Sequence, residues 1–349
     1  MNATPKQFIS MIMSRKSLSF LVGLVLLCGL ASSPAAEKGF SAEKSDKGVE
    51  VKLNGKLLTR YVLGEGNKPF LFPVIGPNGS GMTRAYPMRD VPGEKQDHPH
   101  HRGVWFGHQG VNGFDSWHEP KTLHERKLTD EKRKEALAHL AATVHREFKR
   151  VAANDKQATI VSVNDYVGAD GTKLMSDLRR IVFREAKGKR YIDYDITLFA
   201  EFGDVTLKDM KDCGFNIRVP HSMTVDAKEG GAILNSRGDR DKDAWGKRAE
   251  WCAFYGPVDG KTAGIAMLNH PGSFRFPTPW HARTYGLFTA NPFGTKSLDK
   301  NAEDGTITLK KGEKIQLKHR LVFHEGTPEE ADIAGEYARY AKPAKKAKK

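Results

Sequence analysis

The chain has 349 residues, enough for one large domain or two modest ones. Its 56 lysine and arginine residues exceed its 42 acidic residues, which gives a net charge of +14 at pH 7. Three unopposed bases near the N-terminus and five lysines after Ala341 account for part of this excess and leave +6 on the body, where bases and acids are mixed. No basic patch carries interleaved stacking aromatics, so the composition argues against a nucleic-acid partner.

The N-terminal residues predict a secretory signal. Arg15 and Lys16 precede an apolar run from Leu18 to Leu30, and small residues suited to a signal peptidase follow at Ser33 to Ala35. The run is shorter than the ~20 residues of a membrane-spanning helix, and no later run approaches that length. We therefore expect residues 1–36 to be a cleaved signal and the mature chain to be periplasmic or extracellular, without an integral membrane segment.

The body of the sequence, residues 37–341, shows one strand signal after another. Residues Glu50–Leu63 form two alternating runs joined by Asn54-Gly55, the pair that a type I′ hairpin turn favours. The connections between later runs lack the helical period of a parallel α/β fold. The sequence therefore predicts a single all-β domain, a large antiparallel β-sandwich of at least about twelve strands. The further short runs rich in β-branched or aromatic residues cover 158–167, 179–185, 190–200, 215–220, 250–256, 264–270 and 314–324.

Helix is expected in few places. The charged residues 119–135 fit a surface loop or a short helix. Thr327, Pro328 and Glu330 form a capping-box start, which predicts a C-terminal helix closing the sandwich. Residues 342–349 are expected to form a disordered lysine-rich tail.

Cysteine content and missing motifs narrow the chemistry. Cys213 and Cys252 remain after signal cleavage. One disulfide would suit an exported protein, but two buried free thiols fit a strand-rich core better. The sequence has no GxSxG elbow, P-loop, CxxC pair or dinucleotide-binding glycine pattern, which argues against nucleotide and flavin chemistry.

Histidines gather in one segment, DHPHHRGVWFGHQGVNGFDSWHE, which runs from Asp97 to Glu119. Five of the chain's 13 histidines lie here: His98, His100, His101, His108 and His118. These histidines have three possible roles. They could bind a metal ion together with Asp97 or Glu119, act as acid–base groups near their natural pKa, or hydrogen-bond the backbone of a glycine-rich turn as structural groups. Their density favours a functional site, but the spacing does not decide between metal and acid–base chemistry. If residues 104–111 form a strand, His108 shares a face with Val104 and Phe106, opposite Trp105.

Two further segments carry candidate site residues. Residues 269–294 contain His270, Trp280 and His281 among four prolines, which predicts rigid, irregular loops that either line a ligand cleft or pack on themselves. Residues 235–256 contain three alternating aspartates, but these lack the spacing of a calcium loop and fit a solvated turn. Trp245, Arg248 and Trp251 in the same segment suit contacts with sugars or planar acids.

These motifs together carry a family resemblance. The blocks HPHHRGVWFGHQGVNGFDSW, NSRGDRDKDAWGKRAEWC and HPGSFRFPTPWHARTYGLFTANPFG occur in this order. Over roughly residues 51–324 the sequence resembles the exported bacterial family catalogued as methane oxygenase PmoA, a label that implies a metal-dependent oxygenase. The strand-rich pattern is also similar to the large sandwich of galactose mutarotases and polysaccharide lyases, in which histidines and a carboxylate act on a sugar.

Three functions follow as hypotheses. The first is an exported carbohydrate-active enzyme, a lyase, hydrolase or epimerase that uses histidine and a carboxylate. The alternatives are a metal-dependent oxygenase and a non-catalytic sugar-binding module. The expected ligand is a carbohydrate or other small molecule, with a divalent metal ion as the candidate cofactor. We expect the segments 98–118 and 269–294 to face one common cleft.

The candidate residues fall into three groups. Arg102 is expected to orient a ligand oxygen, and Glu119 is the favoured carboxylate, ahead of Asp97. Trp105 fits a buried core position equally well, because it lies in the middle of a predicted strand. Catalytic candidates are His100, His101, His108, Arg102, His281 and Glu119; substrate-binding candidates are Trp105, Trp117, Trp280, Arg283, His270 and Arg248; metal-ligand candidates are His98, His100 and His108.

Overall fold

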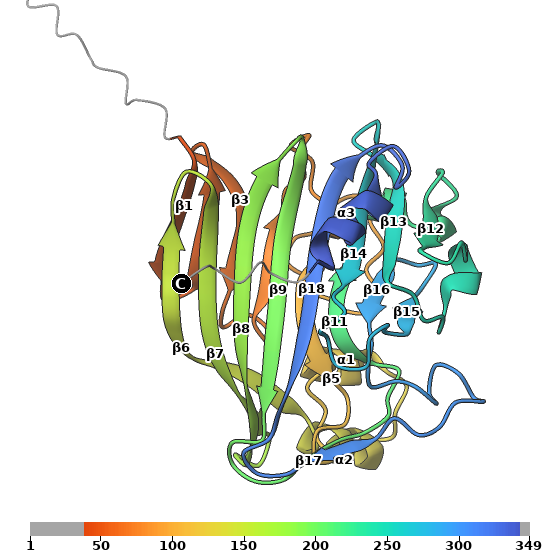
Figure 1. Cartoon of the computed structure of the whole chain (residues 1–349). Helices are drawn as coiled ribbons and strands as arrows, with labels where there is room; N and C mark the ends of the chain where they lie inside the picture. The colour runs from red at the N-terminus through yellow and green to blue at the C-terminus, as the bar shows by residue number, and fades with distance from the viewer. Residues whose placement is uncertain (1–37, 343–349) are drawn as a thin grey trace, which may run out of the picture. The chain divides into compact units, whose positions relative to one another are not determined.

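A computed structural model describes residues 38–342, which belong to one compact unit. The expected signal at residues 1–36 and the tail residues 343–349 lie outside the described part. Two eight-stranded sheets pack face to face (Figure 1). The first has the order β1 (Phe40–Ser45), β2 (Gly48–Leu53), β3 (Lys56–Val62), β4 (Phe70–Val74), β5 (Val104–His108), β11 (Cys213–Arg218), β16 (Leu287–Ala290), β15 (Trp280–Ala282). The second has the order β12 (Ala232–Asn235), β13 (Trp251–Val258), β14 (Lys261–Asn269), β18 (Lys314–Glu325), β9 (Lys189–Phe199), β8 (Lys173–Ala186), β7 (Gln157–Gly168), β6 (Ala141–Ala153).

The remaining elements are short. β10 (Val205–Leu207) and β17 (Ile307–Leu309) form a separate two-stranded ribbon. The helices are α1 (Pro120–Glu125), α2 (Asp130–Ala138) and α3 (Ile333–Tyr340), with 3₁₀ turns η1 (His221–Met223), η2 (Val225–Ala227) and η3 (Asp241–Ala244). None of the helices within residues 38–342 is long and apolar enough to cross a membrane.

The predicted antiparallel β-sandwich is confirmed, because neighbouring strands in both sheets pair antiparallel. The predicted hairpin is β2–β3, whose turn residues Asn54 and Gly55 have φ of 51° and 73°, as a type I′ turn requires. The main core lies between the sheets and combines side chains such as Phe106 and Phe215 of the first sheet with Phe183 and Phe323 of the second. Cys213 and Cys252 are both buried and free.

The C-terminal helix begins later than its capping box suggests. The Thr327 backbone N–H donates to Glu330 Oε2 at 2.8 Å, and the Glu330 N–H donates to Thr327 Oγ1 at 3.2 Å. The regular helix, however, starts at Ile333, after Asp332 in a left-handed conformation. Ile333 packs with Trp251 and other residues in a separate apolar cluster, so α3 covers the second sheet on the side away from the main core.

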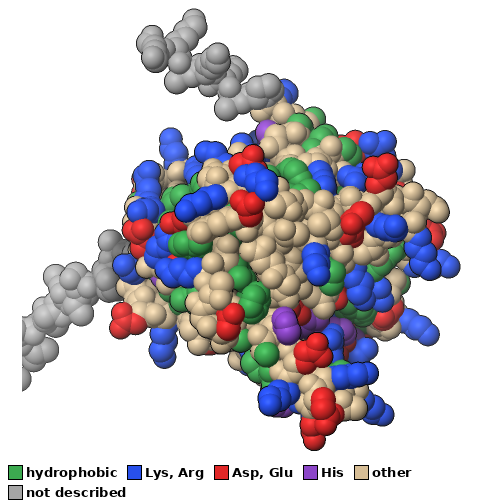
Figure 2. All heavy atoms as spheres, turned by 90° about the horizontal axis from the view of Figure 1, so that it is seen from below, with side chains coloured by type: hydrophobic (Ala, Val, Ile, Leu, Met, Phe, Trp, Pro, Cys, Tyr) green, Lys and Arg blue, Asp and Glu red, His purple; other side chains and the backbone are tan. Residues whose placement is uncertain are grey.

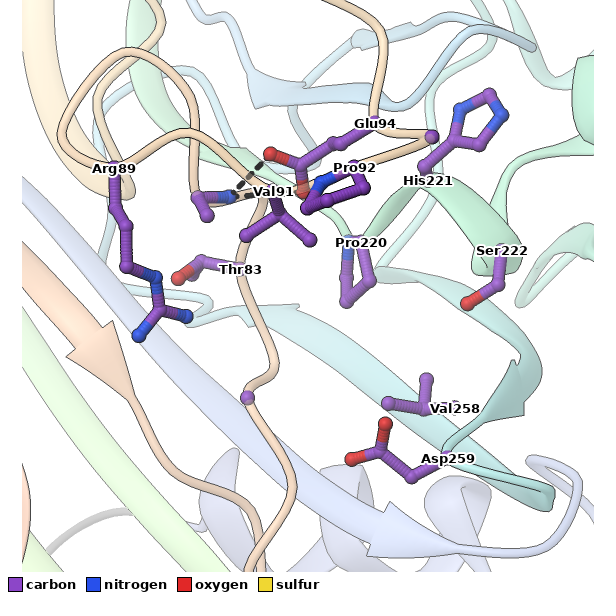
Figure 3. A pocket seen from close by; sticks show the side chains of 13 residues that line it. Thr83, Arg89, Val91, Pro92, Glu94, Pro220, His221, Ser222, Val258 and Asp259 are labelled. Atoms are coloured by element: carbon purple, nitrogen blue, oxygen red, sulfur yellow. Dashed lines mark hydrogen bonds between the residues drawn. The ribbon is translucent and has the colours of Figure 1, made fainter.

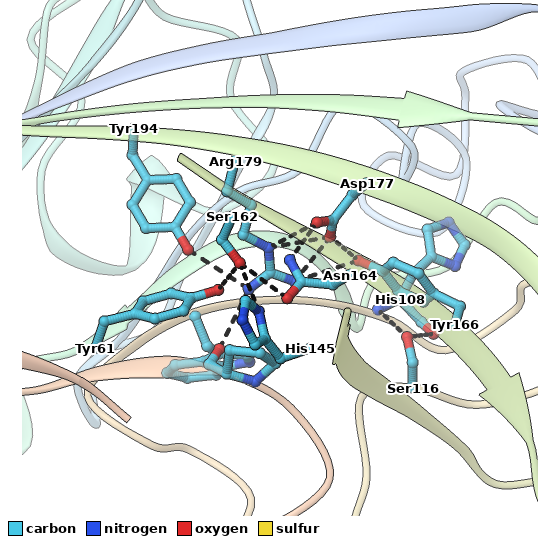
Figure 4. Close-up of polar contacts among 12 residues, drawn as sticks. Tyr61, His108, Ser116, His145, Ser162, Asn164, Tyr166, Asp177, Arg179 and Tyr194 are labelled. Carbon is cyan, nitrogen blue, oxygen red and sulfur yellow. Dashed lines mark hydrogen bonds and ion pairs between the residues drawn. The ribbon is translucent and has the colours of Figure 1, made fainter. Parts of the chain in front are cut away.

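A cluster of buried polar side chains joins the two sheets inside the sandwich (Figure 4). We call it the inter-sheet network; it comprises Tyr61, Ser162, Asn164, Tyr166, Asp177, Arg179 and Tyr194. At its centre the guanidinium of Arg179 donates to Asp177 Oδ2 at 2.8 Å, and neither side chain is exposed. Asp177 also accepts from Asn164 at 2.6 Å and from Tyr166 at 2.8 Å.

The inter-sheet network crosses between the layers twice. Arg179 on β8 donates to the carbonyl of Pro69, next to β4, at 3.3 Å. Tyr61 on β3 donates to Ser162 Oγ on β7 at 3.2 Å. Burial is the largest single influence and would lower the pKa of Arg179. The attractions of Asp177 and of the nearby tyrosines together raise that pKa well above its ordinary value, so the charge persists in the interior.

Candidate active site

One cavity of about 280 Å³ is lined by four of the five histidines of the histidine-rich segment. Its lining comes from residues 98–126, 211–212 and 281–285, so the predicted meeting of the two histidine segments at one cleft is confirmed. On the face shown in Figure 2, histidine side chains reach the surface among basic and acidic side chains. The lining residues are His98, His100, His101, Trp117, His118, Arg126, Lys211, Asp212, His281, Arg283 and Tyr285.

The first sheet brings these segments together. The strand β5 follows the loop that carries His98, His100 and His101, and it pairs with β11, which follows Lys211 and Asp212. β11 pairs with β16, and β16 pairs with β15, which carries His281. Trp105 of β5 belongs to a cluster with Trp117 that is separate from the main core. The cavity therefore lies on the outer side of the first sheet.

Four aromatic rings form a column along the cavity. The ring of Tyr285 stacks on His98 at 5.1 Å, His98 stacks on His101 at 4.8 Å, and His101 stacks on Trp105 at 5.3 Å. His98 has the left-handed φ of 48°, a conformation that non-glycine residues rarely adopt and that functional sites often hold. Stacking fixes the plane of the His101 ring, and Trp105 supports that ring from beneath rather than meeting a ligand.

Hydrogen bonds set the tautomer of His101. Arg218 Nη1 lies 3.2 Å from His101 Nδ1, and a guanidinium can only donate. Nδ1 must therefore accept, which places the ring proton on Nε2. Arg218 in turn donates to Asp97 Oδ1 at 2.8 Å, and Arg84 binds the same oxygen. Burial and the neighbouring His100 and Arg218 charges keep the pKa of His101 well below its ordinary value.

His281 has the opposite tautomer. Its Nδ1 lies 2.7 Å from the carbonyl oxygen of Lys211, which can only accept, so the ring proton is on Nδ1 and Nε2 keeps its lone pair. Burial lowers the pKa of His281 to about 3, despite the Lys211 carbonyl, and the charges of Arg283 and Lys211 add to the effect. The ring is neutral near pH 7 and can accept a proton through Nε2.

The other two buried imidazoles of the cavity are held by their own partners. His118 Nδ1 lies 2.7 Å from Asp115 Oδ2, and Arg126 Nη2 lies 2.8 Å from His118 Nε2. His100 Nδ1 lies 2.9 Å from Thr122 Oγ1 on α1. Burial, followed by the nearby His118 and Lys68 charges, holds the pKa of His100 well below its ordinary value.

Arg102 and Glu119 do not line the cavity. Arg102 Nε and Nη2 each donate to a different Glu119 oxygen at 2.8 Å, and Lys68 Nζ lies 3.3 Å from Glu119 Oε1. The three groups form a nearly buried ion cluster that satisfies the carboxylate. Arg102 was expected to orient a ligand and Glu119 to be the catalytic carboxylate, but in the structure the two bind one another and neither lines the cavity. Asp97, the runner-up, is held by Arg84 and Arg218 and positions His101.

His108 and three substrate-binding candidates also lie away from the cavity. His108 follows the predicted alternation, packs against Phe293 at 4.9 Å and is fully buried. Trp280 is buried in the main core and donates to the Ala249 carbonyl at 3.0 Å. His270 packs against Tyr340 of α3, and Arg248 donates to the Pro277 carbonyl. Of the substrate-binding candidates, Trp117 and Arg283 line the cavity.

The expected metal set is not assembled. Among the residues that the structure describes, no three histidine, cysteine, aspartate or glutamate side chains are arranged to hold a metal ion. His98 and His101 stack face to face, and His108 does not line the cavity of His98 and His100.

Sequence reasoning missed several members of the site. Arg126 belongs to the charged stretch that it assigned to a surface loop or helix, and Lys211 and Asp212 follow no recognisable motif. Tyr285 lies inside the quoted segment 269–294, two residues after Arg283, and its aromatic ring was a usable signal. Alternation along the segment would not have found it, because the 283–286 turn decides its direction.

The histidine loop can join β5 only through a glycine. Gly103 has φ of 52°, and a Cβ there would lie 2.1 Å from the Leu71 carbonyl oxygen. We expect Gly103→Ala to lower the free energy of unfolding by more than about 2 kcal/mol, from backbone strain plus this clash. Gly113→Ala is the matched control, because Gly113 has φ of 87° but open space around it. Gly113→Ala should lower the free energy of unfolding by about 1 kcal/mol, as measured by urea titration. Equal losses for the two variants would contradict the close approach.

A second cavity, of about 380 Å³, lies around Thr83, Pro220 and Asp259 (Figure 3). The Glu94 carboxylate in its lining accepts hydrogen bonds from the backbone N–H groups of Ala85 and Tyr86. His221 is the single histidine of this lining. The paired imidazoles of opposite tautomer occur in the first cavity, which we therefore take as the candidate active site.

Comparison with known sequences identifies the family. The sequence pattern of DUF6807, described as a family of unknown function, matches residues 48–338. The chain belongs to the DUF6807 family. No curated protein matches this DUF6807 chain. None of these comparisons links it to the methane oxygenase family that its motifs resemble.

Three solved structures show a distant likeness to the DUF6807 chain. An α-galactosidase from Lactobacillus brevis is 9% identical with a TM-score of 0.38, and the match covers 82% of this chain and 39% of that one. A GH36 α-galactosidase from Geobacillus stearothermophilus is 11% identical, with a TM-score of 0.36 and coverage of 82% and 40%. A galactose mutarotase related enzyme from Lactobacillus acidophilus is 10% identical, with a TM-score of 0.31 and coverage of 82% and 97%. The DUF6807 chain thus spans about two fifths of the two α-galactosidases.

Proposed function

We propose that this DUF6807 protein is an exported enzyme that acts on a carbohydrate by acid–base catalysis in the histidine cavity. The observation that carries the proposal is the presence of two neutral imidazoles of opposite tautomer in the lining of one cavity. His101 carries an Nε2–H that can donate a hydrogen bond to a substrate oxygen, whereas His281 has a free Nε2 lone pair that can accept a proton. Proton transfer of this kind serves a lyase, an epimerase or a hydrolase equally well.

The lining supports a small polar ligand rather than an apolar one. Ligand cavities are usually lined mainly by apolar side chains. Here nine of the 11 lining residues are charged residues or histidines, and the other two, Trp117 and Tyr285, are amphipathic aromatics. Hydroxyl groups of a sugar would find donors and acceptors around the wall, and aromatic rings suit the apolar face of a sugar ring. The N-terminal signal predicted from the sequence supports an extracellular or periplasmic substrate.

The test is turnover on a panel of neutral and acidic oligosaccharides, followed by reducing ends, polarimetry and ultraviolet absorbance of unsaturated products. We expect turnover that survives dialysis against a chelator, because the proposed chemistry uses imidazoles of this chain. Activity that is lost on chelation and restored by a divalent metal ion would favour the metal-dependent oxygenase hypothesis suggested by the PmoA resemblance. Binding without turnover on any member of the panel would favour a sugar-binding module.

A further inference from the structure

A third hollow, distinct from the cavity of Figure 3, adjoins the histidine cavity. It has a volume of about 350 Å³ and is lined by Lys242, Trp245, Ala282, Arg283 and Thr284. Arg283 lines both hollows. The ring of Trp245 in this hollow also meets the ring of His281 in the histidine cavity edge to face at 4.6 Å, so side chains of the two linings are in contact. The two hollows share Arg283 in their linings, and we call them together the extended cleft.

Arg283 is held in place without an acidic partner. Its guanidinium lies 4.7 Å from the centre of the Trp245 ring and 5.3 Å from that of Tyr285. Within residues 38–342, no carboxylate lies within ion-pair distance of it. Stacking on aromatic rings uses the faces of a guanidinium and leaves its N–H edge free to bind two oxygens at once.

The charge of the extended cleft is unbalanced. Four cations line it, Arg126, Lys211, Lys242 and Arg283, and within the described residues none is ion-paired. Asp212 is the single carboxylate of the lining, and it lies 4.0 Å from His281 Nδ1. Most arginines elsewhere in the core of this protein are paired, as Arg84, Arg179 and Arg218 show. A concentration of unpaired cations along one cleft favours an anionic ligand.

We propose that the extended cleft binds an acidic oligosaccharide, with a carboxylate or sulfate group of the sugar chain on Arg283. One sugar unit lies in the histidine cavity, and its neighbour lies on Trp245 beside Lys242. The half-buried Trp245 ring offers a stacking surface at the outer end. This substrate class rests on the proposed action on carbohydrates and adds the requirement for negative charge.

The test is calorimetric binding of three probes of equal length: galacto-oligosaccharides, oligogalacturonides and sulfated carrageenan oligosaccharides. For the unmodified protein we expect an acidic probe to bind at least about 10-fold more tightly than the neutral one, with the difference shrinking at high salt. Whichever acidic probe binds more tightly identifies the anion as carboxylate or sulfate. Equal affinity for all three probes would overturn the proposal.

Arg283→Met should weaken binding of the preferred acidic probe by about 10- to 100-fold, the range for loss of a hydrogen-bonded charged group. It should change the affinity for the neutral probe much less. Arg89→Met is the control, because Arg89 is an accessible arginine that lines the other cavity, shown in Figure 3, and not the extended cleft. If Arg283→Met weakens neutral and acidic probes equally, or if Arg89→Met has the same effect, the anion does not bind at Arg283. Turnover of a neutral oligosaccharide with no acidic preference would refute this inference and leave the proposed function standing, whereas no binding of any sugar would refute both.

Discussion

Asp177→Ala is expected to lower the free energy of unfolding by about 3–5 kcal/mol. The substitution leaves the Arg179 guanidinium inside the sandwich without its counter-charge, and both side chains are fully buried. It also removes the acceptor of Asn164 and Tyr166, so two more buried donors lose a partner. Urea titration of the purified variant, followed by circular dichroism, measures the change.

A double variant separates the charge from the packing. Asp177→Leu combined with Arg179→Met removes both charges and fills similar space, so it should recover part of the loss seen for Asp177→Ala. Arg60→Ala is a surface control, because Arg60 pairs with Glu50 on the exposed side of β2–β3. Such a pair should cost less than about 1 kcal/mol. A loss for Asp177→Ala as small as that of Arg60→Ala would show that the inter-sheet network does not hold a buried charge.

The sequence predicted the strands well because their signals are local. β2–β3 follow from Asn54-Gly55 and two alternating runs, and the long strands β7, β8, β9 and β18 from runs of β-branched and aromatic residues. The segment 269–294 was predicted less well. It was expected to be irregular loop because of its prolines, but it contains β15 and β16, and β16 lies inside the first sheet. Three of its four prolines lie before β15 and the fourth lies after β16, so none is within either strand.

The inter-sheet network was beyond such reasoning. Asp177 and Arg179 alternate with Leu178 and Arg180 on β8, so the pattern alone fits a solvated face equally well. The side that is buried depends on the register with β7 and β9, which no local signal reveals. Once Ile181 and Phe183 are placed in the core, the two charges must follow them inward, because they share the same face.

The candidate site was predicted as segments but not as side chains. The density of histidines identified the two segments, 98–118 and 269–294, that meet at the cavity. Clusters of titratable groups beside aromatic rings are uncommon in an ordinary hydrophobic core. The choice among neighbouring residues depends on tertiary partners. Arg102 and Glu119 look like ligand-binding groups in the sequence, yet they satisfy one another. His108 is excluded from the cavity by strand alternation, which the sequence did indicate.

His281→Phe is expected to lower kcat by about 10²- to 10⁴-fold on the oligosaccharide that the unmodified protein turns over best. The substitution removes the free Nε2 lone pair but keeps a planar ring against Trp245. The Lys211 carbonyl does not become an orphan, because Asn291 Nδ2 also donates to it at 3.0 Å. The melting temperature should therefore change by only a few degrees. Steady-state kinetics and thermal unfolding on the same preparation measure both quantities.

His270→Phe is the matched control for this prediction. His270 lies in the same segment of the chain but packs against Tyr340, and it does not line the cavity. It should leave kcat and KM within about 2-fold, since neither proton transfer nor ligand contact depends on it. A His281→Phe variant with full activity would exclude His281 as the base. A variant that loses activity only in proportion to its loss of folded protein would assign His281 a structural role, because a catalytic base affects kcat in the fraction that remains folded.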